Sequence, residues 1–126
     1  MSVIDDLPWV REVPGHHAPT PFYLTADMFG GLPVEMAGAE LSALVDQPVA
    51  EEHEHAVPEI YVLLAPEPGA AEIEVHLTGA VHRVVAPAAF YVPACTPHFF
   101  VTKRAVRGSF CLGLLLGPTP SGGTHE

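Results

Sequence analysis

The sequence predicts one all-β domain of the sandwich or barrel type, and three observations support this. Its 126 residues are enough for a single domain. Fourteen prolines and eleven glycines argue against a helix bundle, because a proline inside a helix removes a backbone hydrogen bond. From Ile60 onward, short apolar runs recur between turn residues, and no long helix interrupts them.

The first 33 residues are expected to form a proline-rich arm. Five prolines and the pair Gly30-Gly31 punctuate this stretch. Its apolar residues, Trp9 and Phe22 among them, are too numerous for a solvated tail. We therefore expect residues 1–33 to pack on the barrel or on a partner subunit, residues 34–118 to form the barrel, and residues 119–126 to form a flexible C-terminal tail.

The strands of the barrel are expected in a regular series. Residues 34–45 fit both a helical stripe and an alternating strand, and we prefer the strand. The further strands are expected at residues 60–64, 73–77, 81–85, 90–92, 99–102 and 110–116. Residues 60–64 are apolar on both faces, so either the arm or a second subunit must cover the outer face. We expect a homodimer, the commonest symmetric assembly.

Charge and composition indicate which classes of binding partner are disfavoured. Five basic and fifteen acidic residues give a formal net charge of −10, which disfavours nucleic acid and anionic membranes. Two cysteines are too few for a disulfide framework, the start of the chain does not resemble a signal peptide, and no apolar run is long enough to span a membrane. These features predict a soluble, cytoplasmic protein whose partner is a small molecule.

A cluster of histidines and one glutamate points to a metal site. His53 and His55 lie side by side if their segment is extended, because residues two apart in a strand share a face. Glu59 follows after a turn, and His98 can supply a third imidazole from across the sheet. Such a set suits one divalent transition metal ion (Fe, Mn, Ni, Co, Cu or Zn, with Fe or Zn favoured) rather than calcium or magnesium.

Each of these side chains also has a purely structural interpretation. His53 and His55 can belong to a solvated, acidic loop, and His98 can be a hydrogen-bonded core histidine. Glu59 can be a surface carboxylate, although it leads directly into an apolar strand, where an unpaired charge is costly. The remaining histidines of the arm and tail, His16, His17 and His125, are expected to be uninvolved.

The spacing of these residues resembles that of the cupin superfamily. The first cupin motif reads G-x5-H-x-H-x3-E-x6-G, and the second reads G-x5-P-x-G-x2-H-x3-N. His53, His55, Glu59, Pro93 and His98 fall on the corresponding positions, and the resemblance covers residues 45 to 116. It implies a jelly-roll-like double-stranded β-helix, and it implies that the three histidines and Glu59 are the metal ligands.

The sequence departs from the cupin pattern at the glycines and the final asparagine. Gln47, Pro66, Pro87 and Cys95 replace the glycines, and Thr102 replaces the asparagine. Because proline cannot adopt a positive φ, the turns at the two prolines must differ locally from the cupin pattern.

Strand alternation suggests which residues surround the metal. Tyr61 and Leu63 share a strand face with Glu59, and Phe100 and Thr102 share one with His98. Glu59 and Tyr61 are the candidates for moving a proton, although a buried tyrosine often only packs in the core. Tyr91 is a second possible donor, and Cys95 is either a residue near the metal or a small buried residue. The expected substrate pocket therefore contains Leu63, Tyr91, Cys95, Phe100 and Thr102.

Three functions are compatible with such a site. The resemblance favours a dioxygenase acting on a small enol, carbonyl or phenolic substrate, as in the quercetin and acireductone dioxygenases of the superfamily. A redox-neutral cyclase, isomerase, lyase or decarboxylase is the second hypothesis, with the metal polarising a carbonyl. The third is a cupin that binds a small molecule without catalysis, which an unbroken ligand set disfavours.

Overall fold

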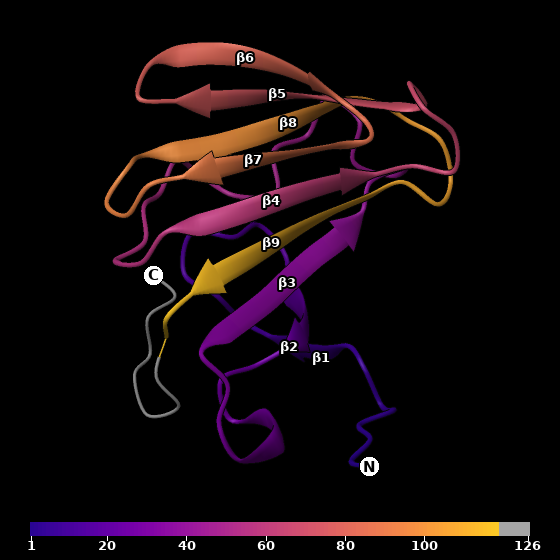
Figure 1. The fold of residues 1–126 in the computed structure, drawn as a ribbon. Helices are drawn as coiled ribbons and strands as arrows, with labels where there is room; N and C mark the ends of the chain where they lie inside the picture. Colours follow the sequence, from indigo (N-terminus) through magenta and orange to yellow (C-terminus); the bar gives the residue numbers. More distant parts are fainter. Residues whose placement is uncertain (119–126) are drawn as a thin grey trace.

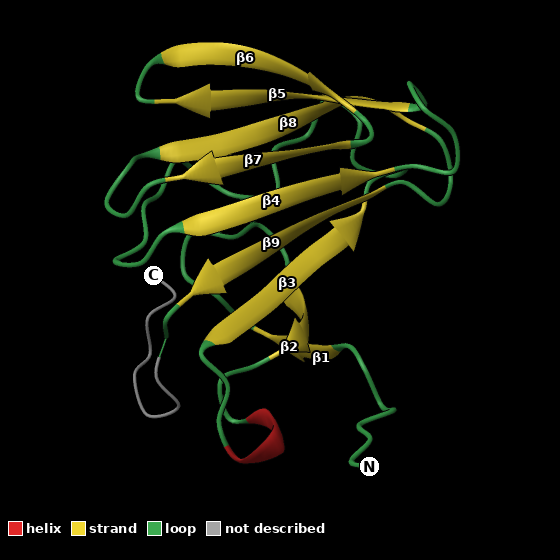
Figure 2. Cartoon of the chain, in the orientation of Figure 1, coloured by secondary structure: helices red, strands yellow, loops and turns green. Residues whose placement is uncertain are grey.

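The computed structural model describes residues 1–118, which form nine strands and one short 3-10 helix (Figures 1 and 2). The C-terminal tail expected at 119–126, with His125, lies outside the described residues. The helix is η1 (Met28–Gly30). The strands are β1 (Trp9–Arg11), β2 (Thr20–Leu24), β3 (Val34–Glu40), β4 (Glu59–Leu64), β5 (Ala71–Leu77), β6 (Ala80–Val85), β7 (Ala88–Val92), β8 (His98–Ala105) and β9 (Phe110–Leu116).

The strands form two antiparallel sheets. The larger has the order β1-β2-β3-β9-β4-β7, and the smaller has the order β6-β5-β8 (Figure 1). The alternation of apolar and polar residues explains the packing: Ile73 and Val75 of β5 are buried, whereas Glu74 between them is partly exposed. The core lies between the sheets and contains Leu41, Leu63, Ile73, Val75 and Val92. The predicted all-β fold is confirmed.

The predicted strands are all present, and most are longer than their apolar runs. The ambiguous segment 34–45 is a strand from Val34 to Glu40, and every residue of it pairs with β9. This regular pairing decides between the two patterns that the sequence allowed. The chain turns after Leu41, whose amide donates a hydrogen bond to the Ser109 carbonyl over 2.8 Å.

Residues of the predicted arm form part of the large sheet. β2 pairs with β3, and β1 pairs with β2, so these two strands extend the sheet at one edge. The order β2-β3-β9-β4 places two strands between β2 and β4, and therefore β2 does not cover the outer face of β4. Leu64 at the end of β4 is 43% exposed. The pairing of two chains through this face stays a prediction.

None of the helical turns in the described residues has the length and apolar character needed to cross a membrane.

Gly38 in the middle of β3 permits a close approach to β9. A Cβ atom at this position would lie 2.8 Å from the Leu112 Cα atom and closer still to the Cys111 carbonyl oxygen. Both contacts are with backbone atoms, which cannot rotate away.

Gly38→Ala is therefore expected to lower the free energy of unfolding by about 3 kcal/mol, the upper part of the range for overpacking. Urea denaturation measures this change. Gly69→Ala is the control: its φ is +84°, its Cβ would meet open space, and only backbone strain of about 1 kcal/mol is expected. A Gly38 variant no less stable than the Gly69 variant would contradict the steric explanation.

Candidate metal centre

Three histidines converge at one end of the barrel. His53 pairs with His98 through two backbone hydrogen bonds: the His53 amide donates over 3.1 Å and the His98 amide over 2.8 Å. The His55 carbonyl accepts a third bond, of 2.7 Å, from the Cys95 amide. One ring nitrogen from each of His53, His55 and His98 lies within 4.8 Å of the other two. Nitrogens this close together could hold one ion between them.

Glu59 joins this cluster from the first position of β4. Its side chain is buried on the inner face of the large sheet. The Oε1 atom lies 3.4 Å from His55 Nε2 and 3.3 Å from His98 Nε2. The structure thus brings together all four residues that the sequence motif singled out.

Backbone carbonyls determine which ring nitrogen of two histidines is protonated. His53 Nδ1 lies 2.7 Å from the Glu51 carbonyl oxygen, and His98 Nδ1 lies 2.8 Å from the Thr96 carbonyl oxygen. A carbonyl only accepts, so each Nδ1 carries a proton, and in the neutral ring Nε2 presents its lone pair. His98 Nε2 then faces the Glu59 Oε1 atom, which is also an acceptor. Two buried acceptors at 3.3 Å need a cation or a proton between them, and these donors fit a transition metal.

The local electrostatics differ between the two histidines. Burial lowers the pKa of His53, and the neighbouring His98 and His16 add to this effect, which favours the neutral imidazole that binds a metal. Burial also acts to lower the pKa of His98, but contacts with Glu59 and the Thr96 carbonyl outweigh it, and the net shift is upward. Burial and the Glu59 carboxylate raise the pKa of Tyr61, so this hydroxyl stays protonated at neutral pH.

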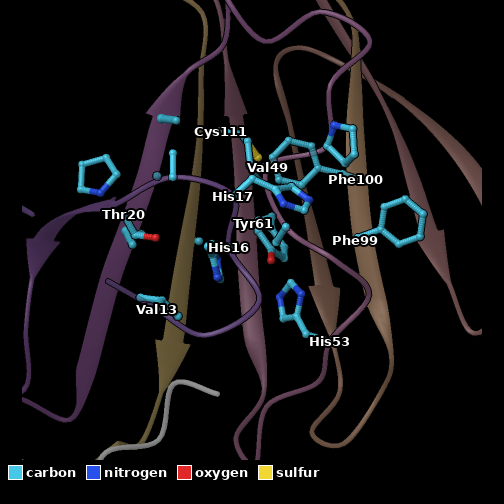
Figure 3. A pocket seen from close by; sticks show the side chains of 18 of the residues that line it. Val13, His16, His17, Thr20, Val49, His53, Tyr61, Phe99, Phe100 and Cys111 are labelled. Carbon is cyan, nitrogen blue, oxygen red and sulfur yellow. The ribbon is translucent and has the colours of Figure 1, made fainter. Parts of the chain in front are cut away.

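A cavity of about 460 Å³ adjoins the cluster, a volume typical of sites for small organic molecules. It runs along the inner face of β3 and β9, where Ala37, Ala39 and Gly113 are too small to fill the space. Figure 3 shows Tyr61 and His53 on one side of it and Thr20 on another. Most of its lining residues are apolar.

Of the residues expected to surround the metal, Tyr61 and Phe100 line this cavity, and the others lie elsewhere. Leu63 and Thr102 are fully buried, but outside the cavity lining. Tyr91 is 56% exposed, because it pairs with Ile60 and therefore lies on the outer face of the sheet. Cys95 is exposed in the connection between β7 and β8.

Cys95 occupies a position where the cupin motif has glycine. Its φ is +59°, the left-handed conformation that glycine adopts without cost. The turn at Cys95 therefore has a backbone conformation that favours glycine. The side chain of Cys95 is exposed and is absent from the cavity lining.

The sequence interpretation missed several residues of the site. His16 and His17, expected to be uninvolved, both line the cavity, and the ring centroids of His16 and His53 are 5.6 Å apart (Figure 3). Gly113 leaves room for Glu59, because a Cβ atom there would lie 2.5 Å from Glu59 Oε2 and the carboxylate would have to shift. The apolar character of the arm indicated packing, but no local pattern indicated which of its residues line the cavity.

Comparison with known proteins relies on structure, since no family model and no curated protein matches this chain. The polyketide cyclase RemF from Streptomyces resistomycificus superposes with a TM-score of 0.59 at 19% identity, over 95% of this chain and 82% of that protein. A predicted oxalate decarboxylase from Thermotoga maritima has a TM-score of 0.59 at 16% identity, over 92% and 99% of the two chains.

An RmlC-like cupin from Shewanella frigidimarina gives a TM-score of 0.59 at 12% identity, over 92% of this chain and 89% of that one. At such identities the likeness concerns the fold alone. Together with the two antiparallel sheets and the His53-x-His55 segment beside β8, it confirms the expected architecture. The chain has the fold of the cupin superfamily.

Proposed function

We propose that this protein is a metal-dependent enzyme acting on a small, largely apolar molecule that carries a carbonyl, enol or phenol oxygen. The observation that supports this most strongly is the pair of buried acceptors, His98 Nε2 and Glu59 Oε1, 3.3 Å apart next to two further imidazoles. A neutral core histidine would instead have a donor opposite Nε2, and a protonated His98 paired with Glu59 would leave the protein without metal. A solvated loop would not bury His55 and Glu59.

His53, His55, Glu59 and His98 would hold the ion. Three nitrogen donors and one carboxylate oxygen suit iron, zinc and their neighbours. When bound, such an ion acts as a Lewis acid toward a substrate oxygen. The Nδ1 hydrogen bonds of His53 and His98 keep the two rings oriented toward a common point.

Tyr61 and the cavity walls supply the remaining functions. Burial and the Glu59 carboxylate raise the pKa of Tyr61, and a hydrogen bond with Glu59 contributes to this shift, so the Tyr61 hydroxyl would hold the Glu59 carboxylate in position. Part of the cavity lining is aromatic and apolar, and it would exclude water and accommodate the hydrocarbon part of a substrate. This part consists of Phe22, Phe99 and Phe100.

Redox-neutral chemistry of the cyclase or decarboxylase type is our first candidate. It is supported by the structural likeness to proteins described as a polyketide cyclase and a predicted oxalate decarboxylase. The dioxygenase that the resemblance to the cupin superfamily favoured is the second candidate, because the same ligands suit iron. The two candidates differ in whether oxygen is consumed.

Two measurements distinguish the two candidate functions. The first is elemental analysis of protein purified without chelator, and the second is an assay of turnover and oxygen uptake with enols, β-dicarbonyls and polyphenols. Turnover without oxygen uptake supports the first candidate, and turnover with stoichiometric oxygen uptake supports the second. A metal-free protein that binds one of these compounds unchanged would contradict both and identify a binding protein.

The double variant His53→Ala/His55→Ala is expected to lose its metal, because two of the four donors disappear. The metal content should fall from about one ion per chain to a small fraction of that. The matched control is His76→Ala/His82→Ala, which removes two imidazoles from β5 and β6, outside the cluster. Full metal retention in the first variant would overturn the assignment.

Metal occupancy is also expected to fall as the pH decreases. A metal ion binds the neutral imidazole, so protons compete with it as the pH approaches and passes below about 6.5, the ordinary histidine pKa. At His98 burial opposes the proton, but Glu59 and Thr96 raise the pKa overall, so competition at this residue begins at a higher pH. Occupancy is thus complete at high pH and lost on acidification. Equilibrium dialysis from pH 8 to pH 5 measures it, and constant occupancy would contradict histidine ligation.

A further inference from the structure

A tight turn of the N-terminal arm is fixed to the segment that leads into the histidine cluster. The His17 amide donates to the Val49 carbonyl over 3.0 Å, and the Glu51 amide donates to the Gly15 carbonyl over 2.9 Å. These bonds join the turn to the residues just before His53. The arm is therefore held in a defined position beside the cavity. Its side chains can distinguish between ligands only if they are held in this way.

Thr20, where β2 begins, has a hydroxyl without a partner. Its Oγ1 atom is buried, and no residue in the described part of the chain forms a hydrogen bond with it. Thr20 lines the cavity, and Figure 3 shows its hydroxyl oxygen directed into that space. A buried hydroxyl is costly unless it is hydrogen-bonded, so a ligand oxygen that reached this group would offset that cost.

Other buried hydroxyls do not share this position. The side-chain oxygens of Thr25, Thr102 and Ser109 are also buried without a hydrogen bond to the described residues, but none of the three lines the cavity. Of these four residues, Thr20 alone lines a cavity large enough for a substrate.

The register of the large sheet places Thr20 at the opposite side of the cavity from the histidine cluster. Phe22, two residues further along β2, pairs with Ala37, Ala37 pairs with Gly113, and Gly113 pairs with Tyr61. Thr20 is thus three strand spacings from β4, roughly 14 Å across the sheet at the usual spacing of about 4.8 Å. The small residues between them leave this span open.

We propose that Thr20 is a specificity-determining residue that hydrogen-bonds a second oxygen of the substrate, at the end remote from the metal. This inference rests on the proposed metal-dependent function. It narrows the substrate class to flat, bicyclic or larger molecules with one oxygen group that binds the metal and a hydroxyl or carbonyl on the distant ring. A compound with oxygen at one end only would leave Thr20 unpaired.

Two naphthalene probes test the proposal with the zinc-loaded protein, in which the metal is redox-inert. 2,3-Dihydroxynaphthalene presents a diol to the metal, and 2,3,6-trihydroxynaphthalene adds a hydroxyl on the far ring. Calorimetry or fluorescence titration gives both dissociation constants. The native chain is expected to bind the trihydroxy probe about fivefold to tenfold more tightly, as one additional hydrogen bond provides.

Thr20→Val, which keeps the shape and removes the hydroxyl, is expected to abolish this preference. Thr20→Ser restores a hydroxyl and should retain the preference. Thr25→Val is the matched control, since it removes a buried, unpaired hydroxyl that does not line the cavity, and it should retain the preference too. Melting temperatures and zinc content, measured for every variant, show whether each remains folded and loaded.

The proposal is overturned if the native protein shows no preference between the probes, or if Thr20→Val keeps it. Failure of the metal assignment is visible separately, as a native chain that retains no zinc. In that event the titrations with the metal-free protein still decide the role of Thr20: a preference that Thr20→Val removes supports it, and an unchanged or absent preference refutes it.

Discussion

The pairing of His53 with His98 is the interaction on which the candidate site depends. Two reciprocal backbone hydrogen bonds hold these residues opposite each other, although 45 positions separate them in the sequence. Their side chains therefore meet by backbone geometry. Each ring is then oriented by a carbonyl two residues earlier in the chain. Glu59 completes the arrangement because the first residue of β4 faces the same interior. Backbone pairing and the start of β4 thus bring these donors close to one point.

The cavity beside this cluster exists because of residues that fill little space. Ala37, Ala39 and Gly113 occupy inward-facing positions of β3 and β9 where larger side chains would close the interior. Gly113 has a second effect, since it leaves room for the Glu59 carboxylate. Stability and function make different demands on this sheet. Its other inward positions, such as Leu63, are filled and belong to the core.

Residues of the arm form one edge of the large sheet and also line the cavity. Its strands β1 and β2 extend the large sheet, and the turn before β2 is bonded to the segment that carries the histidines. A change in this turn would therefore alter both the wall of the cavity and the position of His53. The turn at Cys95 lies on the other side of the cluster, and it adopts the left-handed conformation without a glycine. Backbone hydrogen bonds, such as the one from the Cys95 amide to the His55 carbonyl, hold these connections in place.

Local patterns in the sequence were sufficient for the fold class, for the strands from β4 onward and for the four clustered donors, but they did not indicate β1 and β2 within the expected arm. Alternation identifies strands because it follows from the two-residue repeat of an extended chain, and ligand spacing follows from the same repeat. The choice of strand for residues 34–40 and the exposure of Tyr91 depended on pairing with β9 and β4, which no local pattern records. The positions of His16, Thr20 and Gly113 around the cavity likewise result from the meeting of segments that are distant in sequence. The sequence by itself determined which residues are able to bind a metal. The tertiary structure decided what surrounds them, because the walls of a cavity are set by long-range packing.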